Sequence, residues 1–192
     1  MTRIQQSKTF LSVLIGGGAL FVGANFYFLG IMKGFAALLA IQLFVIWHNR
    51  KQKENLKTFN VARKLHKQGR YNEAINMFLI YLKEVKDSPD KEKTTLLNFG
   101  VYTHSTVAMS YNNIGAGCIE MGQYVKAEES LQRAVEVDGD YSIPYYNLAI
   151  IATINGEDEL VNRYMTKLSA LGYPATMDQI NEKIESLPDS NE

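Results

Sequence analysis

The sequence contains one cysteine, four prolines and three histidines in 192 residues, and its 20 basic side chains are balanced by 20 acidic ones. A single cysteine excludes a disulfide framework and any zinc site built from several cysteines. A net charge of zero argues against a general nucleic-acid-binding protein. His48, His66 and His104 are too far apart in sequence to form a recognisable metal motif. We therefore expect no metal, no cofactor and no nucleic-acid partner.

Charge is scarcest near the amino end, where only Lys33 is charged between Phe10 and Trp47. One continuous helix over this segment would be about 57 Å long at ~1.5 Å per residue. A bilayer hydrocarbon core is only about 30 Å thick and needs ~20 residues to cross. Two shorter helices therefore fit the segment better than one.

The sequence predicts a membrane anchor over residues 1–49, with transmembrane helices at about 8–27 and 30–47. Asparagine and glycines between Asn25 and Gly34 favour a turn there. A single uncleaved span and a cleaved signal peptide are the alternatives. A stripe of small residues on the first helix would also allow self-association through the membrane helices; it comprises Ser12, Gly16, Ala19 and Gly23.

Basic residues follow the second predicted helix, whereas the predicted turn carries only Lys33. This asymmetry predicts that both ends of the anchor face the cytoplasm. The composition suggests a bacterial protein of the inner (cytoplasmic) membrane. We expect four basic side chains to contact lipid head groups, namely Arg50, Lys51, Lys53 and Lys57.

The remainder of the chain contains an internal repeat aligned on glycines. Gly122 and Gly156 are 34 residues apart, and Gly69 lies 53 residues before Gly122. An apolar residue followed by a small one precedes each glycine: Val61-Ala62, Ile114-Gly115 and Leu148-Ala149. A large apolar residue follows each glycine: Phe78, Leu131 and Met165. Small residues would let paired helices touch, and glycine tolerates the positive φ of a tight turn.

This pattern resembles the tetratricopeptide repeat, a 34-residue pair of antiparallel helices. The resemblance implies an all-α fold in which a short solenoid occupies residues 50–175. The repeats would cover about 55–88, 108–141 and 142–175, with an irregular insert at 89–107. In that insert, either the next helix starts early or an extra helix packs between units.

A capping helix and tail are expected over residues 176–192. Thr176 and Gln179 have the spacing of a capping box, and apolar residues follow at helical spacing. Such a helix would cover the apolar surface at the end of a solenoid.

The first helix of each tetratricopeptide unit lines a concave groove, so the resemblance implies a protein-binding site there. The implied groove residues are Phe59, Arg63, His66, Met109, Asn112, Ala116, Tyr146, Ile150 and Thr153. The expected partner is an amphipathic helix or an extended peptide. The alternative is that the C-terminal helix itself fills the groove.

No catalytic motif accompanies these features, so an enzyme is not expected. The chain lacks a phosphate-binding glycine loop preceded by a strand, and Cys118 falls on the buried side of its predicted helix. We expect a membrane-tethered scaffold or adaptor that binds a partner polypeptide. The alternative is a single-span protein with its repeats outside the cytoplasmic membrane, assisting envelope assembly or translocation.

Overall fold

The computed structural model describes residues 16–21, 23, 27, 30–91, 103 and 105–188. These residues form helices and no strand, which confirms the predicted all-α class for the described part of the chain. The helices are α2 (Ile31–Asn55), α3 (Lys57–Lys67), α4 (Tyr71–Asp87), the short 3-10 helix η1 (Pro89–Lys91), α5 (Thr106–Glu120), α6 (Tyr124–Val137), α7 (Ser142–Asn155), α8 (Asp158–Ala170) and α9 (Met177–Glu185).

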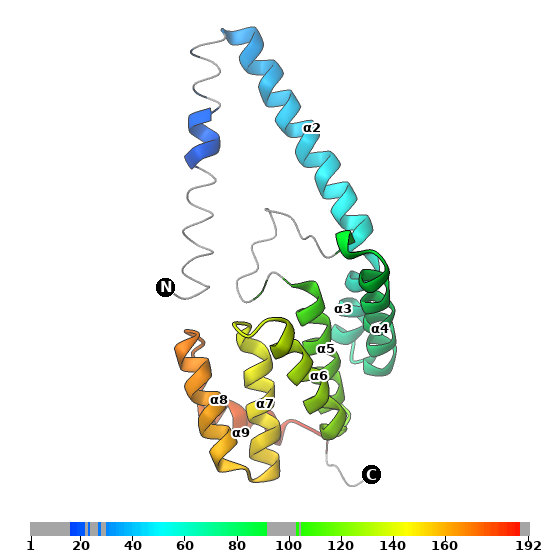
Figure 1. Cartoon of the computed structure of the whole chain (residues 1–192), viewed down its shortest axis with the longest axis vertical. Helices are drawn as coiled ribbons and strands as arrows, with labels where there is room; N and C mark the ends of the chain where they lie inside the picture. Colours follow the sequence, from blue (N-terminus) through cyan, green and yellow to red (C-terminus); the bar gives the residue numbers. More distant parts are fainter. Residues whose placement is uncertain are drawn as a thin grey trace.

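Three helical hairpins, α3/α4, α5/α6 and α7/α8, are stacked side by side in chain order (Figure 1). Each hairpin turns at a glycine in the left-handed region, with φ of 73° at Gly69, 68° at Gly122 and 73° at Gly156. A side chain at these positions would strain the backbone, because L-residues rarely adopt positive φ. The turn role predicted for the three aligned glycines is therefore confirmed.

Small residues lie where the helices of a hairpin meet. Ala62 and Ala74 are completely buried between α3 and α4, and Gly115 and Ala127 hold the equivalent place between α5 and α6. The large residues Phe78 and Leu131 are also fully buried.

The third hairpin departs from this arrangement. Met165 is only partly buried, whereas Leu168 is 1% exposed and Val161 is 6% exposed. The packing of α8 on α7 therefore uses these two residues more than the methionine that the repeat alignment singles out.

Helix α5 begins at Thr106, where the Ser105 side chain accepts a hydrogen bond from the Ala108 amide. Of the two alternatives for the insert, an early start of this helix is therefore wrong at residues 103 and 105, which are not helical. A serine cap satisfies a free amide of the first turn and so fixes where the helix begins. The rest of the insert beyond η1, residues 92–102 and 104, lies outside the described residues.

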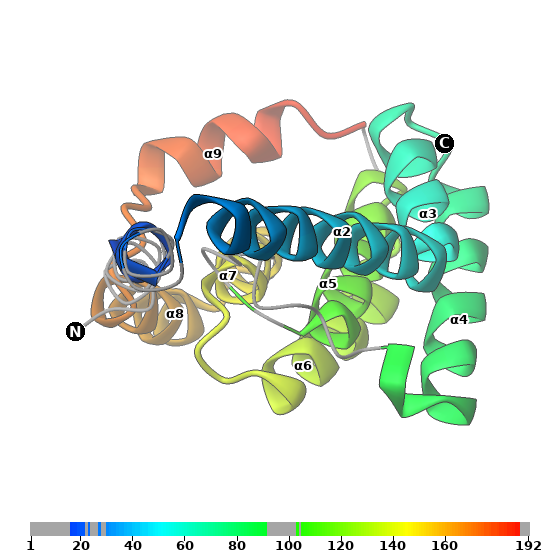
Figure 2. The same cartoon turned by 90° about the horizontal axis from the view of Figure 1, so that it is seen from above.

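Helix α9 does not continue the stack of hairpins. Its predicted capping box is confirmed: the Thr176 hydroxyl and the Gln179 side chain each accept a hydrogen bond from the other residue's backbone amide. The helix packs mainly on α7, on the side away from α6 (Figure 2), and Ile180 is fully buried there. It therefore folds back over one face of the stack.

Helix α2 extends away from α3 as a long rod (Figure 1), and large apolar side chains are exposed along it from Phe35 to Trp47. Helix α2 begins directly after Gly30, whose φ is 78°. Gly30 lies inside the predicted turn between Asn25 and Gly34. The helix then runs unbroken past the apolar segment into the charged residues up to Asn55.

Within the described residues, no helix combines the length and the apolar character that crossing a membrane requires. The structure therefore does not support the transmembrane hairpin predicted at 8–27 and 30–47. Most of the first predicted span lies outside the described residues, and those described, 16–21, 23 and 27, are helical. A side chain added at Gly16 or Gly23, on the small-residue stripe, would meet nothing within 4 Å.

The two glycines of α5 provide a matched test of the packing. A Cβ at Gly115 would lie 2.6 Å from Leu131 Cγ, whereas a Cβ at Gly117 would lie 3.5 Å from Ile75, which is ordinary contact. Gly115→Ala should lower the free energy of unfolding by about 1–3 kcal/mol through overpacking. Gly117→Ala should be neutral or stabilise by up to about 1 kcal/mol, because alanine favours helix. Thermal and urea denaturation would measure both, and equal effects would contradict the assigned contact.

Candidate functional site

The first helices of the three hairpins form a common face, on which α5 lies between α3 and α7 (Figure 2). All nine predicted groove residues belong to these helices. Three of them are buried rather than displayed: Phe59 is 2% exposed, Asn112 is 5% exposed and Ile150 is 1% exposed. Their side chains pack beneath the surface of this face. Arg63 is exposed, and the other five are partly exposed: His66, Met109, Ala116, Tyr146 and Thr153.

A partly buried polar contact joins the middle and last hairpins. Asn147 Nδ2 donates to Asn112 Oδ1 over 3.0 Å, between α7 and α5. These asparagines are one residue out of step in the repeat alignment, which pairs Asn147 with Asn113. Asn113 instead donates to the Met109 carbonyl of its own helix, over 2.8 Å. A satisfied, partly buried hydrogen bond of this kind fixes how neighbouring helices align.

Helix α9 covers the α7 end of the face. The Tyr146 hydroxyl donates to the Gln179 carbonyl over 3.2 Å, and Tyr146 also packs near Tyr173, with ring centroids 5.9 Å apart. Lys183 Nζ lies 2.6 Å from Glu120 Oε1, at the end of α5. At this end of the face, the C-terminal helix therefore occupies the place that a partner would take, which is the alternative considered from the sequence.

The opposite end contains a cavity of about 270 Å³ where α2, α3 and α5 meet. Two predicted groove residues, Arg63 and Met109, share its wall with Lys53, which the sequence assigns to lipid contact. The Arg63 guanidinium lies 5.9 Å from the centre of the Phe59 ring, within the range of a cation–π contact. The full lining is Asn49, Gln52, Lys53, Leu56, Phe59, Asn60, Arg63, Thr106 and Met109.

A second cavity, of about 400 Å³, lies between α2 and η1. Lys51 lies on its wall, and the Lys51 ammonium is 5.6 Å from the Trp47 ring centre. Asp90 and Lys91 supply the side formed by η1. The remaining predicted lipid contacts, Arg50 and Lys57, are exposed but line neither cavity.

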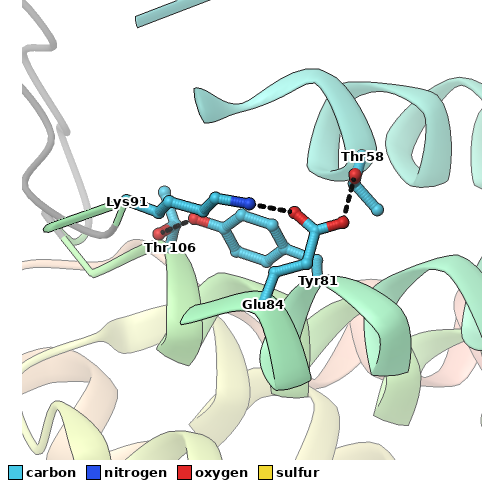
Figure 3. A network of polar contacts seen from close by, with 5 residues as sticks. All are labelled: Thr58, Tyr81, Glu84, Lys91 and Thr106. Carbon is cyan, nitrogen blue, oxygen red and sulfur yellow. Dashed lines mark hydrogen bonds and ion pairs between the residues drawn. The ribbon is translucent and has the colours of Figure 1, made fainter. Parts of the chain in front are cut away.

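A polar network links α3, α4, η1 and α5 (Figure 3), and two of its members, Lys91 and Thr106, also line the cavities. Glu84 on α4 accepts hydrogen bonds from the Thr58 hydroxyl at 2.8 Å and from Lys91 Nζ at 2.9 Å, and so links α3 to η1. These contacts, above all the one from Lys91, lower the pKa of the Glu84 carboxyl. The buried Tyr81 hydroxyl and Thr106 Oγ1 are 2.6 Å apart and join α4 to α5.

His66 lies at the junction of the first two hairpins rather than on open groove surface. Its ring packs edge-on against Tyr71, with centroids 5.2 Å apart, and faces Gly117 of α5. Burial lowers the pKa of His66, and the nearby Glu120 charge opposes this shift only in part. The neutral imidazole is thus the form that this junction favours.

Cys118 is 3% exposed within the core, as predicted, and burial raises the pKa of its thiol. A thiol held protonated is a poor nucleophile. Within the described part of the chain, no cluster of three or more histidine, cysteine or carboxylate side chains could hold a metal ion.

Sequence reasoning did not identify several residues of the α2–α3–α5 cavity. Asn60 carried a signal, because an asparagine recurs before each apolar–small pair. Asn49, Gln52 and Thr106 carried none, because they belong to segments outside the repeat alignment. The arrangement as a whole offers hydrogen-bond donors and two cations beside apolar side chains, which suits binding of a polar or anionic group.

Searches among known protein families and among curated proteins found no match to this chain.

His66 makes stability depend on pH. Its pKa is below 6.5 in the folded chain, so the unfolded chain takes up a proton more readily as the pH falls below 6.5. The free energy of unfolding should therefore be greatest above that value and decrease from about pH 7.5 to about pH 5.5. His66→Phe, which keeps an aromatic ring against Tyr71, should lack this component. Urea unfolding across that pH range would measure the free energy of unfolding of wild type and of His66→Phe. Profiles of the same shape for both proteins would show that His66 is not the source of the pH dependence.

Proposed function

We propose that this chain is a membrane-tethered scaffold or adaptor that binds a partner polypeptide on the common face of α3, α5 and α7. The observation that carries the proposal is the cavity at the α3–α5 end of this face, where Arg63 and Met109 share a wall with residues of α2. Helix α9 occupies the α7 end, so the partner would bind near α2 and α3. The role is binding rather than catalysis.

Membership of the tetratricopeptide family is part of this proposal. It is supported by the 34-residue spacing of Gly122 and Gly156 and by the left-handed turn at each of the three aligned glycines. Helical repeats of this type present extended binding surfaces. Fold-level analogy alone does not establish a function, so the binding role needs its own test.

The membrane tether is supported by α2. Its exposed apolar side chains include Leu43, Phe44 and Trp47, and contiguous exposed apolar surface marks sites of protein or membrane contact. Arg50 and Lys51 follow directly, where they could contact anionic head groups on the cytoplasmic side. We propose that the hairpin comprising α2 and the residues before it holds the repeats at a bacterial inner membrane.

The binding face can be tested by photo-crosslinking in native membranes. A photoreactive amino acid in place of the exposed Asn60 should give a discrete adduct with the partner, whereas one in place of the exposed Gln132 on α6 should not. Met109→Arg should remove the adduct at position 60, because it fills the neighbouring surface with a long charged side chain. Equal adducts at both positions, or an adduct that Met109→Arg leaves unchanged, would place binding elsewhere.

Topology can be tested separately with reporters fused to the carboxyl end of the chain. A reporter that functions only in the cytoplasm should be active, and a secretion-dependent reporter should be inactive. Carbonate-washed membranes should retain the fusion protein. The reverse reporter pattern would favour the single-span alternative, with the repeats outside the membrane, in envelope assembly or translocation.

A further inference from the structure

We propose that the cavity between α2, α3 and α5 binds a carboxylate side chain of the partner, so that the scaffold selects a segment containing glutamate or aspartate. This inference rests on the proposed binding function and specifies the chemistry of the ligand. The cavity walls come from the C-terminal part of α2, from α3 and from the first turn of α5.

The charges on the cavity wall have one sign. Lys53 and Arg63 line it, and no carboxylate is among the described residues that form the wall. Neither cation forms an ion pair within the described part of the chain, unlike Lys91 and Lys183, which pair with Glu84 and Glu120. Among the described residues, therefore, no carboxylate competes with an incoming anion for either cation.

The neutral groups on the wall also favour an acceptor. Gln52 lies between this cavity and the one beside η1, and its Nε2 is buried without a hydrogen-bond partner among the residues that the structure describes. A buried donor without an acceptor is costly, and a carboxylate oxygen is a strong acceptor. Asn49 and Asn60 carry further amide groups on the same wall, whereas the Thr106 hydroxyl is already engaged with Tyr81.

Arg63 is oriented for this role by its contact with Phe59. The ring is 2% exposed and is held against Phe78 and Tyr81, with ring centroids 5.8 Å and 5.2 Å away. A guanidinium carbon 5.9 Å from the ring centre is held by the ring without using its N–H groups, and arginine can bind a carboxylate with two parallel hydrogen bonds. Lysine in its place would lose that fork.

The size and position of the cavity fit a peptide side chain. Its volume of about 270 Å³ is just below the range of about 300–1,000 Å³ typical of small-molecule sites. Leu56 and Met109 provide apolar surface for the methylene stem and neighbouring residue of the ligand. The cavity also borders the common face, so a peptide lying there could place one side chain into it.

A membrane phospholipid fits the position less well. If Trp47 lies at the membrane interface, Lys53 is six residues further along α2, or about 9 Å at ~1.5 Å per residue. The head-group layer adds only about 5–8 Å on each side of the hydrocarbon core. Arg63, on the following helix, would lie beyond it. A peptide carboxylate is therefore the ligand that the observations favour.

The test compares two degenerate octapeptide libraries, identical except for a fixed central glutamate or glutamine, for binding to the full chain in detergent. Wild type should retain the glutamate library at least about fivefold better, equivalent to about 1 kcal/mol. Arg63→Gln should abolish this preference, and Lys53→Gln should reduce it. Arg163→Gln, at an exposed arginine on α8 outside the cavity, should leave it unchanged.

Direct contact can be read from the side-chain NMR signals of Gln52 and Arg63 during titration with N-acetylglutamate amide. Both signals should shift, and N-acetylglutamine amide should shift neither. Equal retention of the two libraries by wild type, or a preference that survives in Arg63→Gln, would overturn the inference. Shifts produced only by phosphatidylglycerol vesicles would assign the cavity to lipid instead. An adduct at position 60 without any glutamate preference would leave the scaffold function standing and reject the carboxylate site alone.

Discussion

The close approach of paired helices at small residues is the constraint on which the rest of the structure depends. Gly115 faces Leu131, and Ala127 is completely buried beside them. Because a Cβ at Gly115 would lie 2.6 Å from Leu131 Cγ, the glycine lets α5 and α6 approach closely at this point, and Leu131 fills the space beside it. The hairpin geometry that results brings α3, α5 and α7 side by side. Without that alignment there would be no common face and no cavity at its end.

The two ends of the common face differ because different segments complete them. At the α7 end, α9 supplies apolar side chains and an ion pair, and Tyr146 is bonded to its backbone. At the α3 end, α2 supplies Asn49, Gln52 and Lys53, which are polar and bring a positive charge. The central part of the face is held in register by the Asn112–Asn147 hydrogen bond. One end of the face is therefore covered by α9, and the other contains a cavity with a polar, cationic wall.

Local patterns predicted the local structure well. The turn glycines, the buried Cys118 and the Thr176 cap each depend on residues close in sequence, and each was found as expected. The surface on which α9 rests could not be read from its own pattern, since an apolar stripe shows that a helix packs but not where. The cavity could not be predicted because part of its lining comes from α2 and from the start of α5, which lie outside the repeat alignment. Composition alone did not predict where the second anchor helix ends. It was expected to end at about residue 47, but α2 continues from the apolar segment through charged residues to Asn55.

The ion pair between Lys183 and Glu120 has a consequence for how the molecule loses its structure. In an open stack each unit touches only its neighbours, so the terminal unit frays first. Here α9 packs on α7 of the last hairpin and, through Lys183, also contacts Glu120 at the end of α5 in the middle hairpin. Loosening α7 and α8 must then also release α9 from α5, which couples two steps that would otherwise be independent. The second and third hairpins and α9 should therefore unfold more cooperatively than the units of an open stack would.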